Sequence, residues 1–143
     1  MELLVVIAII GILASVVLAS LNTARSKGSD AAVKSSLNNA RAQAELYYDS
    51  NANSYAPTAP SSYPATGVGV CSTAAGILNM VTGADNANGT ALGAACNASA
   101  SAWAAAAGLQ ASSTATYYCV DSTGVSKTNT GAVSALGALY ACP

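Results

Sequence analysis

The sequence predicts an α+β chain in which a long N-terminal α-helix leads into a small disulfide-stapled C-terminal domain. Three observations predict this class. An uninterrupted apolar run covers residues 3–21, a proline-free amphipathic segment continues it to about residue 50, and four cysteines are spread over an alanine-rich remainder with β-prone stretches. Its 143 residues leave room for one globular domain once the helix is subtracted. We therefore expect a domain of short helices and an antiparallel β-sheet beside a partly projecting helix.

The apolar run contains no ionisable residue and no proline between Leu3 and Leu21. At ~1.5 Å per residue it spans roughly 28 Å, about the thickness of the hydrocarbon core of a bilayer. Glu2 stands alone at its start, and a lone carboxylate beside so much hydrocarbon requires a partner. The run is thus expected to lie in a membrane or among other apolar helices.

Two ordinary interpretations of this run meet objections. A cleavable secretory signal would find small residues at Val17-Leu18-Ala19, but its flank should be basic, and here it is acidic. A plain membrane anchor has suitable length, yet Arg25, Lys27 and Lys34 would keep the following chain cytoplasmic. The four cysteines favour an oxidising space instead.

The helix is expected to continue to about Ser50 because the stretch from Asn22 to Tyr48 contains no proline and only one glycine, Gly28. Gly11 is a second weak point, within the apolar half, where the helix could melt locally. Apolar residues recur at three- and four-residue steps in the second half, which predicts the face that carries the C-terminal domain. These residues are Val33, Leu37, Ala40, Ala44 and Tyr47 or Tyr48.

Four segments follow from this pattern: residues 1–24 as the apolar helix, 25–54 as its amphipathic continuation, 55–67 as a linker and 68–143 as the globular head. The linker is defined by three prolines within eight residues, Pro57, Pro60 and Pro64.

Within the head, short helices are expected over residues 73–81 and 99–107, with a loop over 83–90 between them. Asn97 or Ser99 would cap the second helix, Gly108 would follow its end, and Trp103 would anchor the core. A β-hairpin is expected over 115–128 with its turn at Ser-Thr-Gly. Residues 131–143 fit either a loop or a last strand.

The four cysteines lack the paired spacing of a zinc site, and the chain has no histidine. Disulfides are therefore expected, and three connectivities are open. We favour Cys71–Cys96 and Cys119–Cys142, because sequential pairing closes two local loops of similar length. Each would stabilise the head by roughly 3 kcal/mol.

Catalysis and nucleic-acid binding are not expected. The commonest general base is absent, the acidic residues are scattered, and no cofactor or metal site is indicated. Only 8% of residues are charged, with a net charge of −1, so no strong field is available to hold a polyanion. Asn88 and Asn97 fit the N-glycosylation pattern, which is frequent by chance.

The stretch from Glu2 to Ala14, ELLVVIAIIGILA, resembles the N-terminal motif of bacterial type IV pilins and pseudopilins. The resemblance is close over roughly the first 25 residues and architectural beyond them. In that family the glutamate is normally the fifth mature residue, after a processed basic leader. Here it is second, so we expect that this sequence lacks a few N-terminal residues.

The resemblance implies the pilin fold and a structural subunit of an extracellular filament for adhesion, motility or surface attachment. Before assembly the subunit would sit in the cytoplasmic membrane as a single-pass protein. Its implied partners are identical copies in a helical filament, the pilus assembly machinery and a prepilin peptidase. Glu2 would pair with a neighbour's N-terminal amine and set the register. The filament core would be formed by Leu3, Leu4, Val5, Val6, Ile7, Ile9, Ile10, Gly11, Ile12, Leu13, Val16, Val17 and Leu18.

Two alternatives to a pilin stay open. A pseudopilin of a type II secretion system shares the N-terminal motif, although such proteins tend to have a calcium-binding C-terminal loop and few cysteines. A membrane-anchored binding module would keep the helix in the bilayer and capture a ligand with the head.

Overall fold

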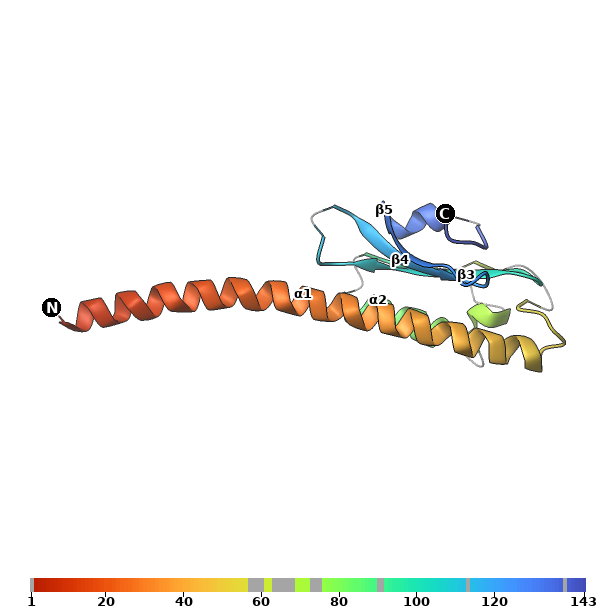
Figure 1. The fold of residues 1–143 in the computed structure, drawn as a ribbon, viewed down its shortest axis with the longest axis horizontal. Helices are drawn as coiled ribbons and strands as arrows, with labels where there is room; N and C mark the ends of the chain where they lie inside the picture. Colours follow the sequence, from red (N-terminus) through yellow and green to blue (C-terminus); the bar gives the residue numbers. More distant parts are fainter. Residues whose placement is uncertain are drawn as a thin grey trace.

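A computed structural model describes residues 2–56, 61–62, 69–72, 76–89, 92–112, 114–137 and 139–143. The architecture is α+β, as predicted. Helix α1 (Glu2–Ser50) runs without interruption for 49 residues. Figure 1 shows its first half projecting away from the head, while its second half lies along the head. At ~1.5 Å per residue the helix is roughly 70 Å long.

A left-handed turn ends α1. Ala52 and Asn53 have φ angles of 55° and 57°, a conformation that no helix continues through. The backbone N–H of Asn53 donates to the carbonyl of Tyr48 at 3.1 Å, and the side chain of Asn51 donates to the carbonyl of Tyr47 at 2.8 Å. The last carbonyls of the helix thereby obtain donors, and the chain turns back toward the head.

The sheet is an antiparallel meander in which each strand pairs with the next along the chain. The Ser122–Gly124 turn joins its last two strands, and Gly124 has a φ of +96°, which confirms the expected hairpin. The strands are β1 (Ser61–Ser62), β2 (Ala94–Ala98), β3 (Trp103–Leu109), β4 (Thr116–Asp121) and β5 (Ser126–Thr130).

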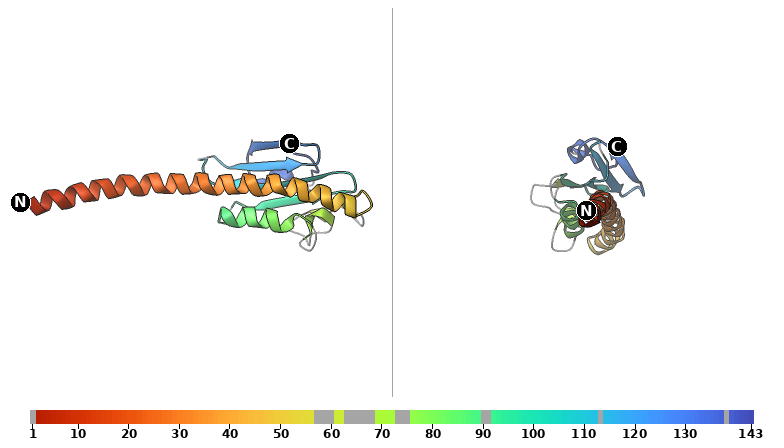
Figure 2. Two further views of the ribbon diagram at one scale, coloured as in Figure 1. Left: turned by 60° about the horizontal axis from the view of Figure 1, so that its bottom comes forward. Right: turned by 90° about the vertical axis from the view of Figure 1, so that its left-hand side faces the viewer.

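The sheet is covered on both faces. Helix α2 (Leu78–Ala87) and the second half of α1 lie side by side against one face (Figures 1 and 2). The other face carries the C-terminal segment, which includes the short 3-10 helix η2 (Val133–Leu136). A second 3-10 turn, η1 (Gly69–Cys71), is buried near the end of α1.

Side chains of β3 alternate between two hydrophobic cores. Trp103, Ala105 and Ala107 belong to the core beneath α1 and α2, whereas Ala104 and Ala106 belong to the core beneath the C-terminal segment. All of β3 is buried. Small side chains on both faces allow the helices and the C-terminal segment to approach the sheet closely.

The helix expected over residues 99–107 is wrong, because residues 103–109 form β3. Alanine is the best helix former, so the run favours a helix when considered alone. As a central strand it gains ladder bonds on both edges and burial on both faces, and this tertiary context outweighs the local propensity. Asn97 lies in β2 rather than at a helix cap. Gly108 lies in β3, where an added Cβ would come within 2.3 Å of the Leu92 Cβ.

The boundaries of α2 also differ from the expectation. The helix begins at Leu78 and runs to Ala87, through most of the segment expected to be a loop; residues 73–75 lie outside the described residues. Val81 and Ala84 are three residues apart and both fully buried, so this turn of helix has its own apolar face. The polar composition of residues 83–90 favoured a loop in the sequence analysis, so this part of the helix was not predicted.

The two remaining expectations concern the linker and the C-terminus. Tyr55 and Ala56 are buried core residues rather than linker, while Pro57, Pro60 and Pro64 lie outside the described residues. In residues 131–143 the described part is a loop with one 3-10 turn and does not add a strand to the sheet.

Candidate functional site

The first half of α1 is the principal candidate site, because no described part of the chain covers thirteen large aliphatic side chains there. Each is between 51% and 77% exposed. They are Leu3, Leu4, Val5, Val6, Ile7, Ile9, Ile10, Ile12, Leu13, Val16, Val17, Leu18 and Leu21. Consecutive positions are included, so the apolar surface surrounds the helix rather than forming a stripe.

The same stretch could cross a membrane by length and composition. Its most apolar 18-residue window has a mean hydropathy of 3.0 and is 0% buried, although a signal sequence near an N-terminus would pass the same test. The helix is continuous at Gly11, and apart from the neighbouring residues and backbone of the helix itself no described atom lies within 4 Å of the position a Cβ would take there. Glu2 is the first residue of α1, and its side chain lies outside what the structure describes.

The second half of α1 has the opposite character. Val33, Leu37, Ala40 and Ala44 are fully buried, and Tyr47 is 8% exposed. The apolar stripe read from the sequence is therefore confirmed as the face that carries the head.

Asp30 fastens α1 to the head at the point where the helix leaves it. Its two carboxylate oxygens accept hydrogen bonds from the backbone N–H groups of Gln110 at 2.7 Å and Ala111 at 3.0 Å. The buried amide of Asn88 donates to Asp30 at 3.4 Å and also to the carbonyl of Gly108. Charge-assisted bonds of this kind are stronger than neutral ones, so Asp30 fixes the head at one position along the helix.

The two disulfides staple opposite faces of the sheet. Cys71–Cys96 lies in the core on the helix side, and Cys119–Cys142 ties the C-terminal segment to the other side. Both are the pairs favoured from the sequence. Their sequence separations of 25 and 23 residues close loops that each stabilise the fold by roughly 3 kcal/mol.

Asp121 reinforces the second staple. One carboxylate oxygen accepts from the Thr123 hydroxyl and from the backbone N–H groups of Thr123 and Val125, and the other accepts from the Cys142 N–H at 2.9 Å. Burial by itself would raise the pKa of Asp121, but these four hydrogen bonds outweigh it, and the pKa lies below its usual value.

Two other groups of the head, the buried Tyr55 and the half-buried Asp85, have shifted pKa values. Burial, together with the hydrogen bond to Glu45, raises the pKa of the Tyr55 hydroxyl to about 12. Burial also raises the pKa of Asp85, which the backbone N–H of Gly93 partly opposes. Neither group lies in the exposed half of α1, and we assign both to the stability of the head.

The two N-glycosylation matches are not supported by the fold. Asn88 and Asn97 are each 1% exposed. The amide of Asn97 donates to the carbonyls of Gly137 at 2.7 Å and Leu139 at 2.8 Å, so both side chains serve as internal donors. A sugar on either amide would displace these bonds, and the sequence pattern is therefore a chance match in the folded domain.

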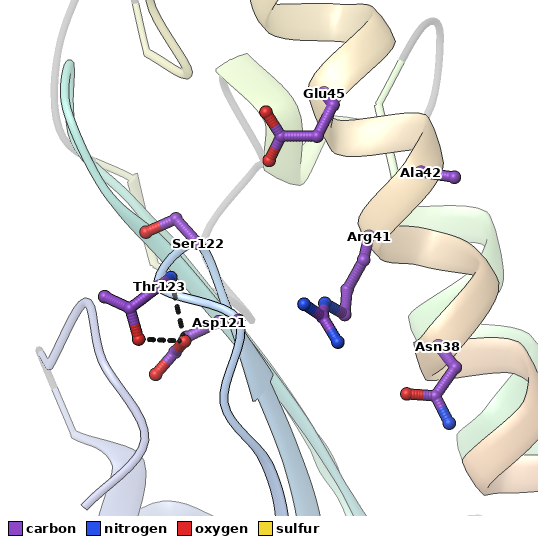
Figure 3. Close-up of a pocket in the computed structure, with 8 residues that line it drawn as sticks. Asn38, Arg41, Ala42, Glu45, Asp121, Ser122 and Thr123 are labelled. Carbon is purple, nitrogen blue, oxygen red and sulfur yellow. Dashed lines mark hydrogen bonds between the residues drawn. The ribbon is translucent and has the colours of Figure 1, made fainter.

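A cavity of about 610 Å³ opens between α1 and the β4–β5 turn. Figure 3 shows the Arg41 side chain extending from α1 toward that turn. Sequence reasoning did not identify this cavity, nor the roles of Asp30 and Asp121, since each depends on residues that are distant along the chain. Within the described part of the chain, no three acidic or cysteine side chains gather in a group that could hold a metal ion.

Comparisons of this chain with models of known protein families, with curated proteins and with solved structures found no match.

Proposed function

We propose that this chain is the structural subunit of a type IV pilus-like extracellular filament, assembled by packing of the apolar half of α1 against the same segment in identical copies. The observation that carries the proposal is the set of thirteen exposed aliphatic side chains on a helix that is rigidly continuous with a stapled head.

The exposed apolar surface is so large that this segment must be shielded from water by lipid or protein. Burying each side chain is worth about 1.5–3 kcal/mol, so leaving the whole segment in water is less favourable than burying it by tens of kcal/mol. Because the apolar surface surrounds the helix, a partner that contacts one side would leave most of that surface exposed to water. Two environments enclose a helix on all sides: a bilayer and a bundle of similar helices. A filament subunit would use both in turn.

The position of the head supports the bundle. The described part of the head lies along the second half of α1, so none of the described residues obstructs the approach of other helices to the first half (Figures 1 and 2). Disulfides on both faces of the sheet are typical of a head that works in an oxidising space outside the cytoplasm.

Glu2 is proposed to set the register in this arrangement. An unpaired carboxylate is too costly to bury among apolar helices, whereas one paired with a neighbour's N-terminal amine is tolerated. Such a pair would oppose sliding of one helix along another, which the uniform aliphatic surface of Leu3 to Leu21 cannot do.

The test is electron microscopy of material sheared from cells that express the full-length gene together with an assembly system, with mass spectrometry of any fibres. Fibres composed chiefly of this chain are expected. Glu2→Ala should reduce fibre yield by at least tenfold while the subunit stays in the membrane fraction, and Asp49→Ala, which removes an exposed carboxylate from the other end of α1, should leave the yield unchanged.

Three results would contradict parts of the proposal. Normal fibres from Glu2→Ala would remove the register role. Fibres that contain the chain only in traces would make it a minor component or a pseudopilin. Membrane-bound protein without any fibres would favour the anchored binding module.

A further inference from the structure

The cavity between α1 and the β4–β5 turn is lined by polar groups from two separate elements. Asn38, Arg41 and Glu45 come from α1, and Asp121, Ser122 and Thr123 come from the end of β4 and its turn. Its volume of about 610 Å³ lies in the range of small-molecule sites. The apolar contribution of α1 to this lining is the methyl group of Ala42.

Arg41 is the cation of this cavity. Its Nη2 atom would lie 3.4 Å from a Cβ placed on Gly124, so the guanidinium reaches across to the turn. The side chain is half-buried, and no hydrogen bond or ion pair joins it to another residue within the described ranges. Its donor groups are therefore available to a ligand.

The two neighbouring carboxylates do not neutralise Arg41 because each already serves other donors. Asp121 accepts four hydrogen bonds from Thr123, Val125 and Cys142. Both oxygens of Glu45 lie within hydrogen-bond distance of the Tyr55 hydroxyl, at 2.9 and 3.1 Å. Glu45 is exposed, so its carboxylate can also accept from a hydroxyl group of a ligand, whereas Asp121 is buried and its oxygens already accept four hydrogen bonds.

We propose that this cavity binds a carboxylated sugar, with the Arg41 guanidinium holding the carboxylate of a hexuronate-like unit. A planar guanidinium fits a carboxylate with two parallel hydrogen bonds. Glu45 accepts from ring hydroxyls, Asn38 both donates and accepts, and the hydroxyls of Ser122 and Thr123 complete a hydroxyl-rich wall.

The charges around the guanidinium select among anions. Two carboxylates flank Arg41 in the lining, so a doubly charged phosphate group would be repelled by them about twice as strongly as a monoanionic carboxylate that binds the guanidinium. The polar lining likewise offers little to a ligand with a large apolar body. A free acidic sugar therefore fits better than a phosphate or an apolar peptide.

The test uses the full chain in detergent micelles, titrated with sodium glucuronate and followed by NMR at the Gly124 amide and the Arg41 side-chain N–H. Saturable shifts at both are expected. Arg41→Gln should weaken binding about ten- to a hundredfold, as for the loss of a charge-assisted hydrogen bond. Arg41→Lys should weaken binding less, because lysine keeps the positive charge and loses only the two parallel hydrogen bonds of the guanidinium.

Matched controls separate this site from general charge effects. Lys127→Gln removes an exposed cation on β5 outside the cavity lining and should leave glucuronate binding unchanged. Glucose lacks the carboxylate of glucuronate, and acetate lacks its hydroxyl groups. Both should bind at least tenfold more weakly than glucuronate. The indole N–H signal of Trp103, which is fully buried, reports whether each variant retains the fold.

Several outcomes would overturn the proposal. Absence of saturable shifts in the folded wild-type chain, or unchanged binding by folded Arg41→Gln, would remove the site. If acetate binds as tightly as glucuronate, the sugar hydroxyls do not contribute to binding and the ligand is not a sugar. Shifts at Gly124 that appear with protein concentration alone would assign the cavity to a second copy of the chain. Because the measurement is made on unassembled protein, its failure is independent of filament formation.

Discussion

The two halves of α1 are one continuous helix with two opposite relations to solvent. Leu13 in the first half is 60% exposed, whereas Leu37 in the second half is fully buried. The first half carries large aliphatic residues on all sides, and the second carries one narrow stripe with small residues such as Ala40 and Ala44. Backbone conformation does not distinguish the halves; the arrangement of apolar side chains does.

This difference shows where the chain completes its folding. The stripe of the second half matches one sheet and one helix of the same chain, so its burial is finished within the subunit. The first half has an apolar surface that no described part of the chain covers. Its burial requires lipid or other molecules, and the function proposed above uses that requirement.

A matched pair of substitutions should separate the halves most strongly. Leu37→Ala leaves a cavity in the core and should cost about 2–5 kcal/mol of the free energy of unfolding of the head. Leu13→Ala makes the same chemical change on an exposed surface and should leave head stability unchanged within about 0.5 kcal/mol. Denaturant unfolding in mild detergent, followed by the fluorescence of Trp103, measures both; equal losses would contradict the division.

The dependence of head stability on pH should come second in size, and it concerns the head alone. Because the folded pKa of Asp121 is depressed, its contribution is present above the unfolded pKa of about 3.9 and is lost as the pH falls through the folded value. Asp121→Asn should cost about 1–3 kcal/mol near neutral pH, since it turns an amide donor toward existing donors.

The difference between this variant and the wild type should shrink as the pH falls below about 4. Asp49→Asn, at an exposed site on α1, provides the control. Thermal unfolding at a series of pH values measures the effect. A difference that stays constant down to pH 2 would show that the Asp121 carboxylate does not contribute through its charge.

The smallest effect should come from the two glycines of α1. Apart from the neighbouring residues and backbone of the helix itself, no described atom lies within 4 Å of a Cβ built on Gly11 or Gly28, so each Ala substitution should stabilise the helix by up to about 1 kcal/mol. Amide hydrogen exchange in micelles should slow locally in both variants. If Gly11→Ala also lowers fibre yield while Gly28→Ala does not, close helix contact at Gly11 in the assembly is indicated. No local slowing in either variant would contradict the intrinsic cost assigned to glycine.

The sequence predicted the regions whose structure depends on nearby residues. The long helix, its buried stripe, the β4–β5 hairpin and the burial of Trp103 could be read from spacing and composition. The two disulfides are the favoured pairs, but the sequence left three connectivities open and the structure decided between them. The alanine run at residues 104–107 could not be read in this way, because alanine favours a helix locally and becomes a strand only where the sheet and two covering layers enclose it.

By itself, the sequence determined that this protein has an apolar rod, an amphipathic continuation and a stapled head, because periodicity and hydrophobicity act over a few residues. Only the tertiary structure decided which carboxylates bind backbone groups, which asparagines are buried and where Arg41 meets the β4–β5 turn. Those features join residues up to 81 positions apart. Contacts over such separations are selected by packing of the whole chain, which leaves no local pattern in the sequence.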